Sequence, residues 1–180
     1  HELGHKSSRF EQRLGGILLC LVSYPGFKIE HIRGHHVNVS TPEDQSSSRY
    51  NQSLYAFLPV TIRNNIASAW RLEAERLARK GIGAFSRHNE LLRWYALTAA
   101  FAAGFTLWLG WQGLVFFLLQ SAVAIVLLEI VNYLEHYGLR RRKLDNGRYE
   151  RTTHLHSWNS NHLLTNMLLF QLQRHSDHHA

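Results

Sequence analysis

The chain has 180 residues and a mass of 20.9 kDa, enough for one domain of ordinary size. An aromatic content of 12%, only three prolines and the single Cys20 exclude an intrinsically disordered chain, a collagen-like repeat and a disulfide scaffold. Twenty Lys and Arg against 13 Asp and Glu give a net charge of +7, which suits a nucleic acid, an anionic membrane face or an acidic protein as partner.

The first half of the chain alternates short apolar runs with polar segments. Residues 14–22 form an apolar run too short to span a bilayer, so we expect it inside or against the membrane face. Residues 41–52 are polar and serine-rich, and we expect a plain connecting loop. Residues 67–80 predict an amphipathic helix with Trp70 and Leu77 on one face and a Glu75–Arg79 pair on the other.

A long apolar stretch follows, which the mean hydropathy of −0.24 conceals. Residues 94–128 contain no Asp, Glu, Lys, Arg or His. The stretch predicts a transmembrane hairpin with spans of about 94–110 and 114–132, turning near Gly110–Gly113. Basic residues precede and follow the hairpin but are absent from its turn, so its open ends are expected on the cytoplasmic side. The alternative is a buried helical pair of a soluble protein.

The last predicted element is a helix over residues 160–175. Its leucines and methionine recur at helical spacing, which is typical of a packing face. Asn159, Ser160 and Asn161 precede this run and are expected to cap the helix.

The chain has thirteen histidines, as many as all its carboxylates, and nine of them gather in four clusters. The clusters read HELGH from residue 1, EHIRGHH from residue 30, NYLEHYGL from residue 132 and HSDHH from residue 175. Histidines three or four residues apart leave the same face of a helix. The nine histidines of these clusters are the candidate metal ligands: His1, His5, His31, His35, His36, His136, His175, His178 and His179.

Nine imidazoles are too many for one ion of ordinary coordination number, and they suit two. Imidazole binds iron, copper, zinc and nickel, so the ligand type alone does not choose the metal. HExxH by itself is also a zinc-protease signature, which remains an alternative. Carboxylate and amide side chains beside the clusters are candidates to accept the free ring N–H of a ligand: Glu2, Glu30, Glu129, Asn132, Glu135 and Asp177. His88, His154 and His156 are expected in loops, and His162 is the one further histidine that could approach the site.

HELGHK, EHIRGHH, NYLEHYGL and LQRHSDHHA together resemble the histidine boxes of the bacterial membrane-bound alkane 1-monooxygenases, and WRLEAERL, HNELLRWYALTAA and HSWNSNHLL extend the resemblance along the whole chain. All nine box histidines are present, and Ile32 is a small departure from the family pattern. The chain begins on the first box and ends one residue after the last. The resemblance therefore implies part of a longer protein with further spans before His1.

The resemblance implies an all-α integral membrane protein like the membrane fatty acid desaturases and hydroxylases, in which residues 1–180 are part of one domain. It implies two non-haem irons and O₂-dependent hydroxylation of the terminal methyl of n-alkanes, on the cytoplasmic side of a multi-pass bacterial inner-membrane protein. Electrons would come from rubredoxin, itself reduced by an NAD(P)H-dependent reductase.

The basic run Arg140, Arg141, Arg142 and Lys143 is either a topology signal that contacts anionic lipid or a docking surface for an acidic rubredoxin. Its place beside a membrane span argues against nucleic acid. Two related membrane enzymes, a xylene-type monooxygenase and a desaturase, remain open alternatives.

Overall fold

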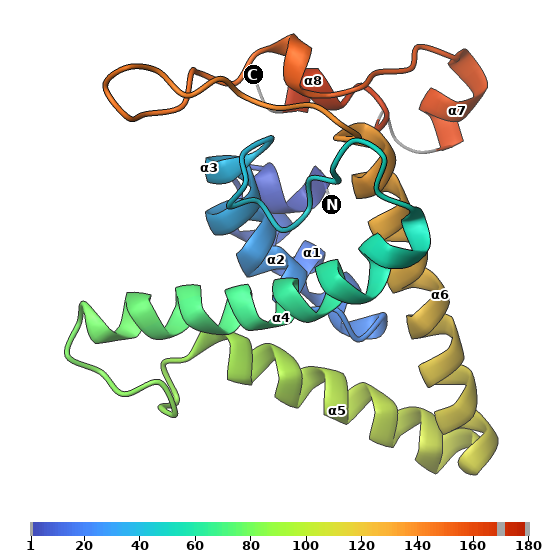
Figure 1. Cartoon of the computed structure of the whole chain (residues 1–180). Helices are drawn as coiled ribbons and strands as arrows, with labels where there is room; N and C mark the ends of the chain where they lie inside the picture. The colour runs from blue at the N-terminus through green and yellow to red at the C-terminus, as the bar shows by residue number, and fades with distance from the viewer. Residues whose placement is uncertain (1, 169–171, 179–180) are drawn as a thin grey trace. The chain divides into compact units, whose positions relative to one another are not determined.

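The computed structural model describes residues 2–168 and 172–178, and this part of the chain is helical (Figure 1). Its one strand-like pairing in the described residues is an isolated bridge between Lys143 and Tyr149. The elements in chain order are η1 (Glu2–His5), α1 (Arg9–Leu21), α2 (Gly26–Glu30), η2 (His31–His35), α3 (His36–Asn38), α4 (Leu54–Ala78), α5 (Glu90–Leu109), α6 (Trp111–Glu135), η3 (His154–His156), α7 (Leu163–Leu168) and α8 (His175–His178).

Two compact units share these elements. Unit 1 comprises His1–Gly34 and Arg63–Leu127, and unit 2 comprises His35–Ile62 and Leu128–Ala180. The dividing points fall inside η2, α4 and α6. The element η2 is a π-helical turn, a wider turn than the α-helix and one that is frequent at functional sites.

Unit 1 is organised around a small apolar core from three helices. Ile29 of α2, Ala69 of α4 and Leu91 of α5 are buried against one another, and Trp70 and Tyr95 pack on them. The burial of these side chains is the main favourable term in holding the helices together.

Buried ion pairs join the same helices at one end. Glu73 of α4 accepts from Arg33 at 2.9 Å and from Arg76 at 2.7 Å. Glu90, the first residue of α5, lies 2.8 Å from Lys28 and 3.2 Å from Arg33. Arg33 therefore ties the second histidine box to both α4 and α5.

The segments predicted to form a transmembrane hairpin are the helices α5 and α6, and the turn between them is shorter than expected. That both helices cross a bilayer stays a prediction. Asn89 caps α5 by accepting from the Leu92 N–H at 3.1 Å, and Gly110, with φ of 67°, is the single residue between α5 and α6. A Cβ at Gly113 would lie 2.1 Å from the Phe105 carbonyl oxygen, so only glycine permits this close approach of the two helices.

Among the residues that the structure describes, α6 is the one helix long and apolar enough to cross a bilayer, with a mean hydropathy of 2.6. Only 17% of its most apolar window is buried. A soluble protein would bury the greater part of so apolar a helix. Large exposed apolar side chains continue from the end of α5 along α6: Leu107, Trp108, Trp111, Phe116, Leu118, Leu119, Val123 and Leu127.

Two helix boundaries differ from the predictions in the first half of the chain. The short apolar run lies within α1, which begins at Arg9. The predicted helix 67–80 is the second half of α4, which begins at Leu54 and continues through Pro59. The Ser53 hydroxyl accepts from the Ala56 N–H at 3.2 Å and so supports a start well before the apolar positions that predicted the helix.

The continuous helix predicted over 160–175 is wrong. Residues 160–162 and 172–174 are not helical, and among the described residues of this segment the helical ones belong to α7 and to the start of α8. Gln173 folds back on this region, because its carbonyl accepts from the Ser160 N–H at 2.9 Å and its side chain donates to Asn166 at 2.8 Å. Asn159 accepts from the Ser176 N–H at 2.8 Å, at the start of α8, and does not cap a helix beginning at residue 160.

Candidate metal centre

Three histidines from three different boxes meet in the interior of unit 2. His35 closes η2, His136 follows the last residue of α6, and His175 begins α8. Each offers a ring nitrogen, and these atoms all lie within 4.8 Å of one another. The three imidazoles are fully buried. We call this set the histidine trio.

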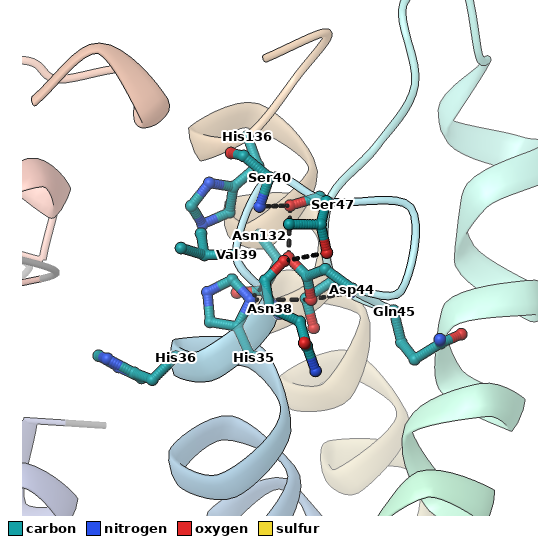
Figure 2. Close-up of polar contacts among 12 residues, drawn as sticks. His35, His36, Asn38, Val39, Ser40, Asp44, Gln45, Ser47, Asn132 and His136 are labelled. Atoms are coloured by element: carbon teal, nitrogen blue, oxygen red, sulfur yellow. Dashed lines mark hydrogen bonds and ion pairs between the residues drawn. The ribbon is translucent and has the colours of Figure 1, made fainter. Parts of the chain in front are cut away.

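The outer ring nitrogen of each trio member faces an oxygen. His35 Nδ1 lies 3.0 Å from both carboxylate oxygens of Asp44, and Figure 2 shows this imidazole directed at Asp44. His136 Nδ1 lies 3.1 Å from the carbonyl oxygen of His156. His175 Nδ1 lies 3.2 Å from Glu135 Oε2. The contacts of His35 and His136 are hydrogen bonds in which an oxygen accepts a ring N–H, so they favour the tautomer in which Nδ1 is protonated and Nε2 carries the lone pair. Glu135 lies within ion-pair distance of His175 Nδ1.

This tautomer makes the inner side of the trio suited to a cation. His136 Nε2 and His175 Nε2 lie 3.1 Å apart. If both carry lone pairs, they repel each other unless a proton or a metal ion lies between them. Neutral imidazoles with an acceptor on the far nitrogen are the usual environment of histidine metal ligands. The residues present therefore fit a metal ion.

Burial keeps these imidazoles neutral. Desolvation, together with the neighbouring His35, lowers the pKa of His136 to about 3. Desolvation and the nearby His136 likewise lower the pKa of His175. Both rings are therefore in the neutral, ligating form throughout the physiological pH range.

Other box histidines pair within each unit. In unit 2, His36 Nε2 lies 3.0 Å from His178 Nε2, and the His178 ring stacks on His175 at 5.3 Å between centroids. In unit 1, the His5 and His31 rings meet edge to face at 5.1 Å. His1, His179 and the side chain of Asp177 lie outside the described residues.

The predicted neighbours of the site lie in different surroundings. Glu135 contacts His175 as given above. Asn132 Nδ2 donates to Glu129 Oε2 at 3.1 Å, and both side chains are buried in unit 2. Glu30 is buried in unit 1. Asn132 and Glu129 thus form a buried polar pair on the same helix that ends next to His136.

Asp44 is a candidate site residue that sequence reasoning missed. It lies in the segment expected to be a plain connector, but its carboxylate is buried. It accepts from the Ser46 N–H at 3.0 Å. It also accepts from the Ser47 hydroxyl and contacts His35 (Figure 2). Burial by itself would raise the pKa of Asp44, but His35 and these donors lower it to about 2. The sequence offers no signal beyond its place eight residues after a histidine box.

The remaining histidines have other surroundings. His88, His154 and His162 are exposed. The His156 side chain is buried with Nε2 3.3 Å from Glu150, and only its backbone carbonyl approaches the trio. The isolated turn of η1 spans four residues as a 3₁₀-helix, whereas a zinc protease places HExxH on an α-helix, so this geometry gives that alternative no support.

The basic run after α6 divides into structural and exposed members. Arg141 donates to the carbonyl of Glu150 at 2.7 Å and to that of Val37 at 3.3 Å, and its own N–H donates to Ser40. Arg140, Arg142 and Lys143 are exposed.

Comparisons with known proteins agree with the histidine pattern. The family model for fatty acid desaturases matches residues 1–180. Alkane 1-monooxygenase 2 of Pseudomonas aeruginosa is 67% identical over the whole chain, and alkane 1-monooxygenase 2 of Alcanivorax borkumensis is 63% identical. The xylene/toluene monooxygenase hydroxylase component XylM of Pseudomonas putida is 28% identical over 99% of the chain. The chain spans 48%, 47% and 47% of these relatives. Because the family model matches from the first residue to the last, the chain belongs to the fatty acid desaturase family.

Proposed function

We propose that this chain is the histidine-bearing part of a membrane alkane 1-monooxygenase. The enzyme would convert the terminal methyl of an n-alkane to a primary alcohol, using O₂ and electrons from rubredoxin. The observation that carries the proposal is the buried histidine trio, in which three ring nitrogens lie within 4.8 Å of one another and an oxygen faces Nδ1 of each ring. Relatives that are 62–67% identical and bear this activity in their names support it.

The nine box histidines are the proposed ligands of two non-haem irons. Two pairs of facing ring nitrogens in unit 2 favour two ions over one. The first pair is His136 with His175, and the second is His36 with His178. Iron bound there would supply the redox chemistry of O₂ activation that the strong, non-acidic C–H bond of an alkane requires. No protein side chain is then needed as a nucleophile or as a general base toward the substrate.

The chain's own residues prepare this site. Asp44 and the His156 carbonyl accept from Nδ1 of His35 and His136 and hold these two imidazoles in one tautomer and one orientation, and Glu135 lies 3.2 Å from His175 Nδ1. Full burial of the trio keeps bulk water from it and keeps the imidazoles of His136 and His175 neutral. An alkane offers no polar group, so its binding depends on apolar burial, about 0.8 kcal/mol per CH₂. Apolar helices such as α6 suit a substrate that arrives from lipid.

We also propose the hairpin topology, with α5 and α6 crossing the bacterial inner membrane and their open ends in the cytoplasm. Exposed Arg140, Arg142 and Lys143 would then face the cytoplasm beside α6. An acidic rubredoxin could dock there by charge complementarity.

The test uses the full-length protein, expressed in membranes with rubredoxin and its reductase. We expect two irons per chain and 1-alkanols as products from n-alkanes. The His136→Ala variant should lose iron and turnover, whereas His162→Ala, which changes an exposed histidine, should keep both. Alkenes or unsaturated acyl chains as products would identify a desaturase. Benzylic alcohols formed from xylene would identify a xylene-type monooxygenase. One zinc per chain would contradict the proposal.

A further inference from the structure

A groove of about 640 Å³ lies between α1 and the start of α5 in unit 1. Its lining is mixed, with cations and one acid beside apolar side chains. The residues that matter for its chemistry are Arg9, Arg13, Lys28, Glu90, Arg93 and Trp94. None of them belongs to a histidine box, and the proposed hydroxylation does not use them.

The charges of the groove do not balance. Its one carboxylate, Glu90, is already neutralised by Lys28 at 2.8 Å and by Arg33 at 3.2 Å. Arg9, Arg13 and Arg93 are exposed, and within the described residues no carboxylate lies within 4.0 Å of their guanidinium groups. Three arginines thus face one groove without an acidic partner, and such an arrangement attracts an anion.

Close helix packing fixes the wall of the groove. A Cβ at Gly16 would lie 2.7 Å from the Trp94 ring, so the glycine lets α1 rest directly on the indole. Cys20 Sγ donates to the Trp94 carbonyl at 3.3 Å. The indole N–H donates to Glu90 at 3.0 Å, and the Lys28 ammonium lies 4.9 Å from the ring centroid. These contacts hold the Trp94 ring in one orientation beside Glu90 and Lys28.

The groove lies where charged sequence gives way to apolar sequence. After Trp94, α5 contains no charged residue up to its end at Leu109. On α1, Phe10, Leu14 and Leu18 are spaced four apart and are 73%, 38% and 49% exposed, directly after Arg9, Arg13 and Ile17. Apolar stripes flanked by arginines, together with a half-buried tryptophan, are typical of the headgroup layer of a bilayer.

We propose that this groove binds the phosphate headgroup of an anionic phospholipid. The three arginines pair with the phosphate and the anionic headgroup, whereas the acyl chains lie along the exposed apolar stripe of α1 and the apolar part of α5. Guanidinium groups suit this ligand, because they donate two parallel hydrogen bonds to a phosphate.

The experiment titrates the full-length protein in neutral detergent with phosphatidylglycerol or phosphatidylcholine and counts bound lipid by native mass spectrometry. The variant is Arg9→Gln, Arg13→Gln and Arg93→Gln combined. Its matched control combines Arg63→Gln, Arg71→Gln and Arg79→Gln, which change three exposed arginines of the same unit outside the groove. A second variant, the lysine triple, combines Arg9→Lys, Arg13→Lys and Arg93→Lys. It preserves the charge of the groove and is the alternative test if the glutamine variant does not fold.

We expect selective binding of phosphatidylglycerol that weakens with salt. The glutamine triple should lose roughly 100-fold in affinity, because each basic side chain near an anionic lipid is worth about fivefold. The control and lysine triples should retain binding. Three results would overturn the proposal: equal affinity of the wild-type protein for the two lipids, unchanged affinity in the glutamine triple, or displacement of the lipid by equimolar inorganic phosphate. The readout is lipid binding, so it is independent of iron content and of hydroxylation.

Discussion

Asp44 is the residue through which a loop contacts the candidate metal centre. Its carboxylate faces the ring nitrogen Nδ1 of His35. The same carboxylate also accepts hydrogen bonds from the Ser46 N–H and the Ser47 hydroxyl. With a pKa of about 2 it is ionised at any pH at which the enzyme would work. Its charge both orients His35 and offsets part of the charge of a bound cation.

We expect Asp44→Asn to weaken iron binding about 10- to 100-fold, the usual cost of losing such an outer partner. The amide can still form a hydrogen bond, but it no longer provides a negative charge beside His35. Iron per chain, measured at limiting iron by elemental analysis, reports the effect. Glu43→Gln, which changes the exposed neighbouring carboxylate, should leave iron content unchanged. Equal iron affinity of Asp44→Asn and the wild-type protein would contradict this role.

At the scale of elements, α2, η2, α4 and α5 depend on the ion pairs around Glu73. Burial by itself would raise the pKa of Glu73, but Arg76, the Glu90 N–H and Arg33 lower it to about 2. A lowered pKa in the folded state means that the stabilising effect is complete above the ordinary value of 4.5 and disappears as the pH falls toward 2. The residue sits where the second histidine box meets its supporting helices.

The Glu73→Gln variant tests this pH dependence. At pH 7 we expect it to lower the free energy of unfolding by about 2 kcal/mol, because Arg33 and Arg76 lose a shared buried partner. The difference from wild type should shrink as the pH falls from 5 to 2, because this carboxyl is protonated below about pH 4.5 in the unfolded chain but only near pH 2 in the folded protein. Thermal unfolding in detergent across this pH range measures it. The control Glu75→Gln, on the exposed side of α4, should have the same stability as the wild-type protein at every pH. If Glu73→Gln lowered the free energy of unfolding by the same amount at every pH, the ion pairs could not be the cause.

Some helix boundaries of this chain could be predicted from the local sequence, and others could not. The end of α5 near Gly110 was predictable because glycine readily adopts the positive φ found there, whereas the apolar residues on either side favour helix. The last helix was mispredicted because helical spacing of leucines does not reveal the hydrogen bonds of Ser160 and Asn166 to Gln173. Those bonds form only when distant parts of the sequence meet.

At the scale of the whole molecule, the proposed topology predicts which surfaces are accessible from each side of the membrane. In a Cys20→Ser background, which removes the one cysteine of these 180 residues, Gln112→Cys, in the first turn of α6 next to Gly110, should react with an impermeant maleimide added to intact cells. Asp145→Cys, in the exposed segment after α6, should react only after the inner membrane is opened. Labelling of both positions from the same side would refute the hairpin.

The proposed rubredoxin surface predicts a selective kinetic defect. Arg140→Glu combined with Arg142→Glu should raise the KM for rubredoxin at least several-fold at low salt, because both guanidinium groups are exposed. Iron content should not change. Arg141 is left intact because its side chain holds backbone carbonyls. Arg71→Glu, at an exposed position of α4, serves as the control. An unchanged KM for rubredoxin in the double variant would show that rubredoxin does not dock on this surface.

The sequence by itself determined the candidate ligands, the apolar character of the hairpin and the family, because these follow from residue type and spacing along the chain. Only the tertiary structure decided which histidines meet, that Asp44 and the His156 carbonyl orient two of them, and that Arg141 is structural. The reason is physical. A periodic pattern records which side chains share a face of one element, whereas a buried hydrogen bond between a loop and a helix depends on how the chain folds back, which leaves no local signature.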